Sequence, residues 1–308
     1  MTWLVVLEKM VMLVLLMVVG FGCAKAGWVD SAFSQKASRL VMNVFIVCTI
    51  ISSVANVEPM LSNLELLITA GSVFLVFFLG AGLGWLGAHL LRMKGHDKNV
   101  GLLSVFFMNN VFIGFPVVEA LFGKNAIFCA SLTNLPFNLL LYSIGTTLLR
   151  GEGKRGRMTV REIFTMPMIA TLAAVVIFLF QIPIPALVAD TLSTLGAATV
   201  PMSMIIVGIS LSHVPVRKAL LDGRAYGMSL VRLILCPVLT WLVLGFLLPP
   251  GMELVKEILI VISACPSAAM ITILCVRFGK DDQFASKVNF LSTVLCAVTM
   301  PVITYFLL

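Results

Sequence analysis

Two short polar segments lie inside stretches that are otherwise apolar enough to cross a membrane. The first runs from Asn109 and Asn110 through Gly114 to Pro116, and the second is Cys265-Pro266-Ser267. Lipid offers no hydrogen-bonding partner, so a membrane helix is interrupted only where protein or a water-filled cavity satisfies the freed backbone groups. Paired interruptions in corresponding places of two halves are typical of transporters, where they form the substrate site near mid-membrane. The pair therefore predicts a transport site.

The chemistry expected at such a site is the binding of an anion. Where a helix restarts after a break, its first backbone N–H groups are unpaired and its dipole end is positive. Two such ends can hold a carboxylate without a full positive charge. The amides of Asn109 and Asn110 and the hydroxyl of Ser267 can contact the substrate or satisfy backbone groups, and Gly114 lets another helix approach closely. For either break alone a simple kink is an equal alternative, whereas the pair favours function.

Four further polar residues are candidate substrate contacts in the spans. They are Asn134, Asn138, Tyr142 and Asn289. A side chain of this kind that faces the bundle can line a substrate cavity, or it can form an ordinary hydrogen bond between helices. Taken singly, each is better explained by packing. Asn138 and Asn289 carry more weight because they sit next to the interrupted spans in the expected repeat.

Glu119 and Arg232 are the notable charges within the spans, and such residues are functional hypotheses by default. Glu119 is a candidate for proton coupling, and Arg232 is a candidate for electrostatic attraction of an anion. Glu119 also lies near the expected outer end of its span, close to Lys124. Arg232 is about two turns from the expected cytoplasmic end, near enough for its side chain to snorkel. Both are coupling or electrostatic candidates of second rank.

No catalytic, metal or cofactor site is expected. The seven cysteines show no metal-ligand spacing, and six of them lie in apolar stretches, which predicts small buried residues. The sequence has no H-E-x-x-H or G-x-S-x-G motif, no paired aspartates within spans and no nucleotide-binding loop. A carrier driven by gradients is therefore favoured, and an intramembrane enzyme and a channel or passive sensor are the alternatives.

These residues must be positioned by a bundle of membrane helices. The chain of 308 residues is 60% hydrophobic and only 11% charged, whereas soluble domains are about one quarter charged. Because about 20 apolar residues cross a bilayer, the composition predicts ten transmembrane helices and leaves only short loops. Their expected ranges are 3–23, 37–56, 64–91, 99–121, 126–149, 162–181, 189–211, 225–248, 254–276 and 284–307.

A basic linker at 150–161 divides five expected spans from five within a single transmembrane domain, 1–308. The first half, 1–149, and the second half, 162–308, then enter the membrane from opposite sides, which predicts an inverted repeat. Most of the 21 Lys and Arg residues fall at the ends of the spans on one side. The positive-inside rule therefore places both termini outside. The net charge of +7 follows from this topology and does not indicate nucleic acid.

The motifs of the fourth and ninth spans resemble those of the auxin efflux carrier family, which includes bacterial malonate- and malate-type permeases and the plant auxin carriers. The run from Met108 to Pro116 is similar to the family's fourth-helix pattern of Asn, a short apolar run, Gly and Pro. Cys265-Pro266-Ser267, the segment 278–281, Ser292-Thr293 and Pro301 resemble its C-terminal pattern. The resemblance spans essentially the whole chain.

That resemblance implies ten helices in two inverted five-helix repeats, with the broken fourth and ninth helices crossing at mid-membrane. By motif match, Asn109 and Pro266 stand at the crossover and Asn138 matches a polar position of the fifth helix. Plant members commonly have Pro where this chain has Met108, and their long central loop is absent here, which suits a bacterial permease.

The function implied is alternating-access transport of a small organic anion, auxin-like or malonate/malate-like, across the cytoplasmic membrane. The implied movement is elevator-like, and the implied partners are the anion, membrane lipid and a second copy in a homodimer. A Na⁺- or H⁺-coupled symporter of the related bile-acid or cation–proton fold is the remaining alternative.

Overall fold

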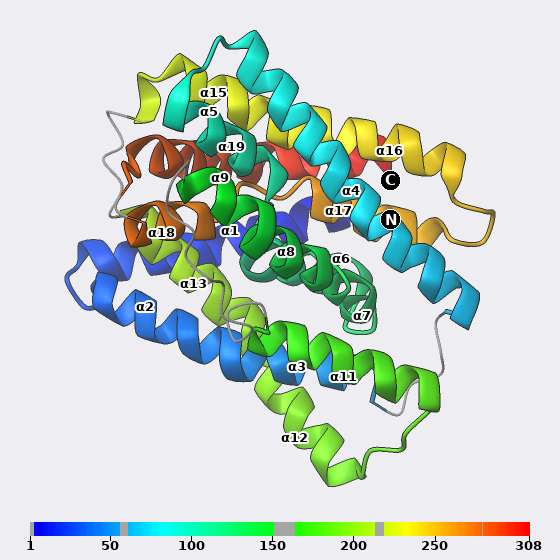
Figure 1. Cartoon of the computed structure of the whole chain (residues 1–308). Helices are drawn as coiled ribbons and strands as arrows, with labels where there is room; N and C mark the ends of the chain where they lie inside the picture. The colour runs from blue at the N-terminus through cyan, green and yellow to red at the C-terminus, as the bar shows by residue number, and fades with distance from the viewer. Residues whose placement is uncertain (1–2, 56–60, 151–163, 213–218, 279) are drawn as a thin grey trace. The chain divides into compact units, whose positions relative to one another are not determined.

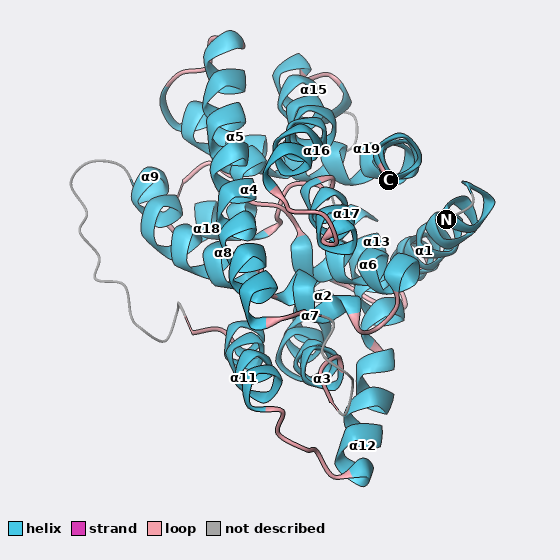
Figure 2. Ribbon diagram, turned by 90° about the vertical axis from the view of Figure 1, so that its right-hand side faces the viewer, coloured by secondary structure: helices cyan, strands magenta, loops and turns pink. Residues whose placement is uncertain are grey.

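The computed structural model describes residues 3–55, 61–150, 164–212, 219–278 and 280–308 (Figure 1). Within these ranges the chain consists of helices and connecting loops and contains no strand (Figure 2). The expected all-helical class is therefore confirmed. An isolated antiparallel bridge pairs Met108 with Ser267. The basic linker at 150–161 lies, apart from Arg150, outside the described residues.

Six helices among the described residues are long and apolar enough to cross a membrane. They are Leu7–Lys25, Asn63–Leu90, Ala126–Leu149, Ala186–Ser212, Gly223–Leu247 and Gln283–Leu307. Two shorter apolar helices, Asn110–Phe122 and Met166–Phe180, lie in two other expected spans. These lengths and compositions are those of a multi-pass membrane protein.

The chain forms two compact units, and each unit draws segments from both halves of the sequence. Unit 1 comprises Met1–Ala70, Val111–Leu135 and Phe164–His213. Its helices are α1 (Trp3–Lys25), α2 (Ser31–Leu40), the π-helical η1 (Val41–Phe45), α3 (Ile46–Ser52), α6 (Phe115–Phe122), α7 (Ala126–Ser131), α11 (Met166–Phe180), α12 (Ala186–Ala197) and α13 (Thr199–Ser212).

Close backbone contact between α1 and α13 organises unit 1. A Cβ added at Gly20 would lie 2.1 Å from the backbone oxygen of Ile205, and one added at Gly208 would lie 1.9 Å from that of Met17. Membrane helices pack through small residues in this way because lipid provides no hydrophobic driving force between them. These two glycines are therefore required by the packing.

Unit 2 comprises Gly71–Asn110, Pro136–Ile163 and Val214–Leu308. It contains most of α4 (Asn63–Leu90) and α8 (Asn134–Leu140). Its other helices are α5 (Gly95–Phe106), η3 (Leu141–Gly145), α9 (Thr146–Arg150), α15 (Gly223–Leu230), η4 (Val231–Leu235), α16 (Cys236–Leu247), α17 (Glu253–Ser263), α18 (Met270–Arg277) and α19 (Gln283–Leu307). The π-helical η2 (Asn110–Gly114) begins at the end of a unit 2 segment.

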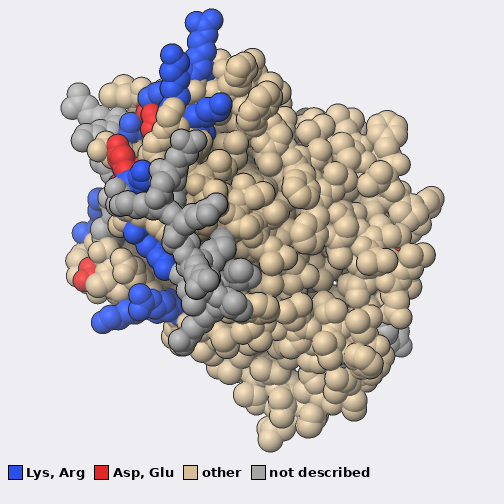
Figure 3. Space-filling view, in the orientation of Figure 1, with Lys and Arg blue, Asp and Glu red and all other residues tan. Residues whose placement is uncertain are grey.

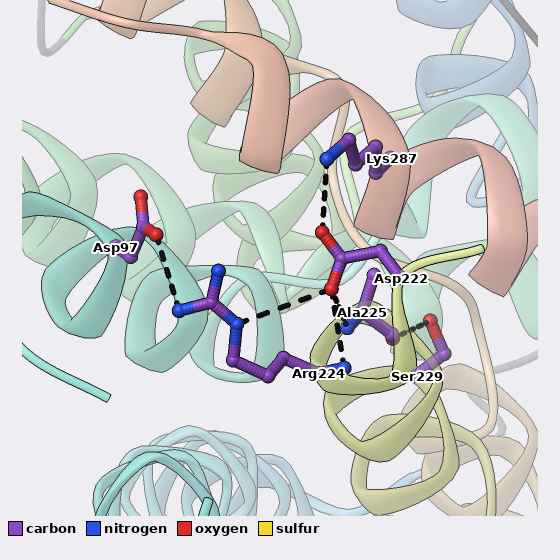
Figure 4. A network of polar contacts seen from close by, with 6 residues as sticks. All are labelled: Asp97, Asp222, Arg224, Ala225, Ser229 and Lys287. Atoms are coloured by element: carbon purple, nitrogen blue, oxygen red, sulfur yellow. Dashed lines mark hydrogen bonds and ion pairs between the residues drawn. The ribbon is translucent and has the colours of Figure 1, made fainter. Parts of the chain in front are cut away.

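An ionic cluster joins α5, α15 and α19 of unit 2 (Figure 4). Asp222 caps α15, accepting the backbone N–H of Ala225 at 3.3 Å, and its other oxygen accepts from Lys287 of α19 at 2.9 Å. Arg224 Nη1 lies 3.5 Å from Asp97 Oδ2 of α5. Burial raises the pKa of Asp222, but the hydrogen bonds from Lys287 and Ala225 and the charges of Lys287 and Arg224 outweigh it and hold that pKa below its usual value.

The charged side chains on the face shown in Figure 3 gather along one edge, and the remaining visible surface is almost free of them. Many large apolar side chains are exposed, including Leu67, Leu90, Phe246 and Phe306. Exposed apolar surface on this scale is unusual for a soluble monomer. It is the surface that lipid covers in a membrane protein.

Candidate functional site

The helical structure of unit 2 is interrupted at both polar segments. After α5 ends at Phe106, Phe107 adopts extended backbone angles of −104° and 116°, and helix resumes at Asn110. The second interruption lies between the end of α17 at Ser263 and the start of α18 at Met270. Pro266 contributes to it because proline lacks an N–H and disfavours helical angles in the residue before it.

The two interruptions pair with each other through their backbones. The N–H of Asn109 donates to the carbonyl of Pro266 at 2.8 Å, and the N–H of Ala268 donates to the carbonyl of Phe107 at 2.9 Å. These bonds flank the bridge between Met108 and Ser267, and both of those side chains are buried. We call residues 107–109 and 266–268 the paired segments. Their pairing satisfies backbone groups that lipid cannot.

An aromatic cluster anchors the first paired segment. The ring of Phe107 lies 6.2 Å from that of Phe77 in α4 and 5.4 Å from that of Phe137 in α8, centroid to centroid. Phe106 packs against the same Phe77 ring at 6.3 Å. Edge-on and tilted arrangements of this kind stabilise aromatic pairs beyond simple burial. The segment after α5 is thus held by α4 and α8 as well as by its backbone partner.

Arg232 links both interruptions from a third segment, η4. Its Nε donates to the carbonyl of Cys265 at 2.9 Å and its Nη1 donates to the carbonyl of Val105 at 3.1 Å. In an unbroken helix the Val105 carbonyl would accept from Asn109, whose N–H instead bonds Pro266. Arg232 therefore supplies the donor that the interruption removes.

The buried position of Arg232 argues against the alternative that its side chain snorkels toward the cytoplasmic end. The side chain is only 1% exposed. An arginine at the centre of a membrane helix costs about 2.5–3.5 kcal/mol on insertion scales. Free carbonyls at the two interruptions offset part of that cost by accepting its hydrogen bonds, so the side chain turns inward.

Several buried polar atoms of unit 2 lack a hydrogen-bond partner among the described residues. They are Ser104 Oγ, Arg232 Nη2, Ser267 Oγ, Thr272 Oγ1 and Thr299 Oγ1. Buried polar groups are nearly always satisfied by protein, water or ligand. Ser267 belongs to the paired segments and Ser104 precedes Val105, so the unsatisfied groups include atoms beside both interruptions. Such groups can bind the polar part of a substrate.

A hydroxyl chain connects Asn289 to the second paired segment. The N–H of Ser267 donates to Ser292 Oγ at 3.1 Å, and Ser292 Oγ donates to the carbonyl of Asn289 at 3.2 Å. Thr293 Oγ1 donates to the same carbonyl at 2.7 Å. The backbone of α19 at Asn289 is therefore coupled to the paired segments, while the Asn289 side chain is half-buried.

The candidate residues chosen from sequence divide between the two units. Those in unit 2 are Asn109, Asn110, Asn138, Tyr142, Pro266, Ser267, Asn289 and Arg232, and those in unit 1 are Gly114, Pro116, Glu119 and Asn134. Asn110, Asn138 and Tyr142 are buried, as are Gly114 and Pro116.

Asn134 and Glu119 have clear surroundings in unit 1. Asn134 Nδ2 donates to Thr171 Oγ1 of α11 at 3.2 Å, which is the packing role considered for it. Glu119 is half-buried, and its Oε2 has no hydrogen-bond partner among the described residues. Lys124, after α6, donates to Ser193 Oγ at 2.8 Å, and burial lowers the pKa of Lys124 although nearby Glu119 and Asp190 oppose this shift.

Sequence reasoning missed the backbone contributors, namely the carbonyls of Val105, Phe107 and Cys265 and the Ser292 hydroxyl. Backbone carbonyls cannot be recognised from residue types, because every residue has one. The indication that the sequence did contain was an arginine, Arg232, inside an expected span. Within the described ranges, no three His, Cys, Asp or Glu side chains come together as metal ligands.

Comparison with known proteins relates nearly the whole chain to transporters. A family model described as "Membrane transport protein" matches residues 5–304. The chain is 25% identical over 298 residues to an uncharacterized transporter of Methanothermobacter thermautotrophicus, covering 96% of each chain. It is 26% identical over 296 residues to an uncharacterized transporter of Methanocaldococcus jannaschii, covering 93% of this chain and 94% of the relative.

Proposed function

Because the chain belongs to the membrane transport protein family, the auxin efflux carrier family, we propose that it carries a small organic anion across the cytoplasmic membrane by alternating access. A transporter of this family acts on a small molecule. The anion we propose is a mono- or dicarboxylate, auxin-like or malonate/malate-like.

The observation that carries the proposal is the backbone pairing of the two interruptions. Asn109 and Pro266 come from opposite halves of the chain, and their segments meet through two hydrogen bonds in the buried part of unit 2. Interrupted helices from two halves meeting at one place are the arrangement that secondary transporters use to bind substrate. In the proposed ten-span topology, α5 and α17 are the first halves of the broken fourth and ninth helices.

The proposed substrate contacts surround these segments. Asn109, Asn110, Ser267 and the N-terminal end of α18 supply neutral donors for a carboxylate. Asn138, Tyr142 and Asn289, which also belong to unit 2, are proposed as further substrate contacts. Gly114, Pro116 and Asn134 belong to unit 1 and are not assigned to this site.

The division into units supports an elevator-like movement. All the paired residues belong to unit 2, so the substrate site can travel with one body. Unit 1 is then the stationary scaffold and the place where a second copy would bind in a homodimer. We propose that both termini lie outside the cell and that lipid surrounds the apolar surface.

The driving force depends on direction. An inside-negative potential favours the exit of an anion by about 2.3 kcal/mol per charge per 100 mV. Export therefore needs no coupled ion, whereas uptake requires co-transported protons or Na⁺. Glu119 is the coupling candidate for protons.

The test is a flux screen of labelled organic acids in proteoliposomes, with and without imposed pH, Na⁺ and voltage gradients. Saturable flux that is stimulated by internal unlabelled anion supports a carrier. Non-saturable flux would indicate a channel, and release of a chemically altered product would indicate an enzyme. Flux of every acid no faster than in protein-free liposomes would contradict the proposal.

A further inference from the structure

We infer that Arg232 makes the site at the paired segments selective for anions, by cancelling the negative ends of the two helices that stop there and by holding the segments together. The inference rests on the proposed function in assuming that substrate binds at the paired segments. It assigns Arg232 as a positioning residue that determines whether the site accepts a substrate with a negative charge.

Two of the helix ends beside the paired segments, those of α5 and α17, are C-terminal. Val105 is the penultimate residue of α5, and Cys265 lies two residues after the end of α17. The last carbonyls of a helix have no partner within it, and together they act as a charge of about −0.5 at the C-terminus. Two such ends in one buried place amount to about one negative charge, which would repel an anionic substrate.

One guanidinium contacts the last turn of α5 and the residue that follows the C-cap of α17. Arg232 donates to Cys265 and Val105 through two different nitrogens. Arginine suits this role because its planar group stays charged and presents several donors in fixed directions. Its charge of +1 matches the sum of the two half charges. The positive N-terminal end of α18, which no side chain caps, is then left uncancelled.

No acidic side chain among the described residues forms an ion pair with Arg232, and its Nη2 lacks a hydrogen-bond partner there. Ser267, which is 1% exposed, also has an unpartnered hydroxyl. Two unsatisfied polar groups beside the paired segments are the second observation that indicates a ligand, because leaving such groups unpaired is unfavourable. A carboxylate oxygen is an acceptor that the Ser267 hydroxyl can serve.

The first test compares malonate with malonamide, its uncharged analogue, as labelled probes in proteoliposomes. We expect wild-type protein to prefer malonate in kcat/KM, and Arg232→Gln to reduce that preference by about tenfold or more. Arg232→Lys retains the positive charge, so its preference for malonate over malonamide should stay within about threefold of the wild-type preference. Arg224→Gln is the matched control, since it removes one exposed arginine from the same helical run. The inference would be overturned if Arg232→Gln lost malonate flux and malonamide flux equally, or if its preference for malonate were unchanged.

The second test needs no substrate and no flux. Amide hydrogen exchange at Asn109 and Ala268 reports whether the paired segments stay closed. We expect exchange at both amides to rise about tenfold in Arg232→Lys, because an ammonium group cannot bridge the two carbonyls as the guanidinium does. Unchanged exchange would overturn the positioning role even if Arg232→Gln does not fold. Absence of malonate flux in wild-type protein, with raised exchange in Arg232→Lys, would instead count against malonate as substrate.

Discussion

The backbone N–H of Asn109 donates to the carbonyl of Pro266 over 2.8 Å, which ties the loop after α5 to the loop after α17. Each loop exposes backbone groups that lipid cannot satisfy, and each supplies partners for the other. The shape of one interruption therefore depends on the other. A substitution in either loop is expected to affect both.

Asn109→Ala and Pro266→Ala are expected to reduce the initial rate of organic-anion flux to about one tenth or less, since misplacement of a site by about 1 Å has effects of that size or larger. Alanine at 109 removes an amide proposed to contact the substrate. Alanine at 266 restores an N–H and favours continuation of α17. Flux is measured in proteoliposomes at equal amounts of folded protein.

Asn125→Ala is the control for these variants, because the Asn125 side chain makes no capping hydrogen bond at the start of α7. It should transport at the wild-type rate. Wild-type rates from both Asn109→Ala and Pro266→Ala would remove the paired segments from the transport mechanism.

Phe77→Leu is expected to destabilise unit 2 by about 1–3 kcal/mol, in the range of core substitutions that lose volume. Phe77 is fully buried and contacts the rings of Phe106, Phe107 and Phe137. Thermal unfolding in detergent measures the effect. Phe78→Leu is the control, since Phe78 is 53% exposed; equal shifts for the two variants would show that the cluster has no special role.

Gly20→Ala is expected to lower the stability of unit 1 by about 1–3 kcal/mol, because the added methyl group overpacks a helix contact. The group it would meet is the Ile205 backbone, which cannot rotate away as a side chain could. Gly22→Ala in the same helix meets nothing within 4 Å and should be neutral or slightly stabilising. If both variants unfold at the same temperature, α1 and α13 do not pack as described.

Asp222→Asn is expected to destabilise the protein at neutral pH by about 1 kcal/mol, the usual contribution of a helix cap. Since the pKa of Asp222 is held below its usual value in the folded state, its contribution is complete above the unfolded pKa of about 3.9. The contribution is lost as the pH falls through the lower folded pKa. The difference in melting temperature between variant and wild type should therefore shrink below about pH 4.

A difference for Asp222→Asn that stays constant from neutral to acidic pH would mean that Lys287 does not pair with the carboxylate.

The sequence was informative about the positions of the interruptions and less informative about which groups satisfy the backbone there. Polar residues and prolines in apolar stretches identified Asn109 and Pro266, because intramembrane polarity is costly and therefore conspicuous. The all-helical class and the multi-pass character follow from composition for the same reason. The antiparallel pairing could not be predicted, since it depends on backbone groups that every residue carries.

Arg232 illustrates the limit most clearly. Its distance from the end of the span was compatible with a snorkelling side chain, and only the spatial arrangement shows two free carbonyls within its reach. Asn134 is the converse case, because its bond to Thr171 supports the packing alternative that sequence reasoning left open. The division of the chain into units also depends on contacts between distant segments, which periodicity does not encode.

Equilibrium binding tests most directly whether the substrate site lies at the paired segments. The anion with the fastest flux in the screen would be titrated by calorimetry into wild-type protein, Asn109→Ala and Asn125→Ala. We expect Asn109→Ala to bind about tenfold more weakly or worse, a loss of about 1.4 kcal/mol, with Asn125→Ala unchanged. Equal affinity of all three proteins for that anion would contradict the placement of the site.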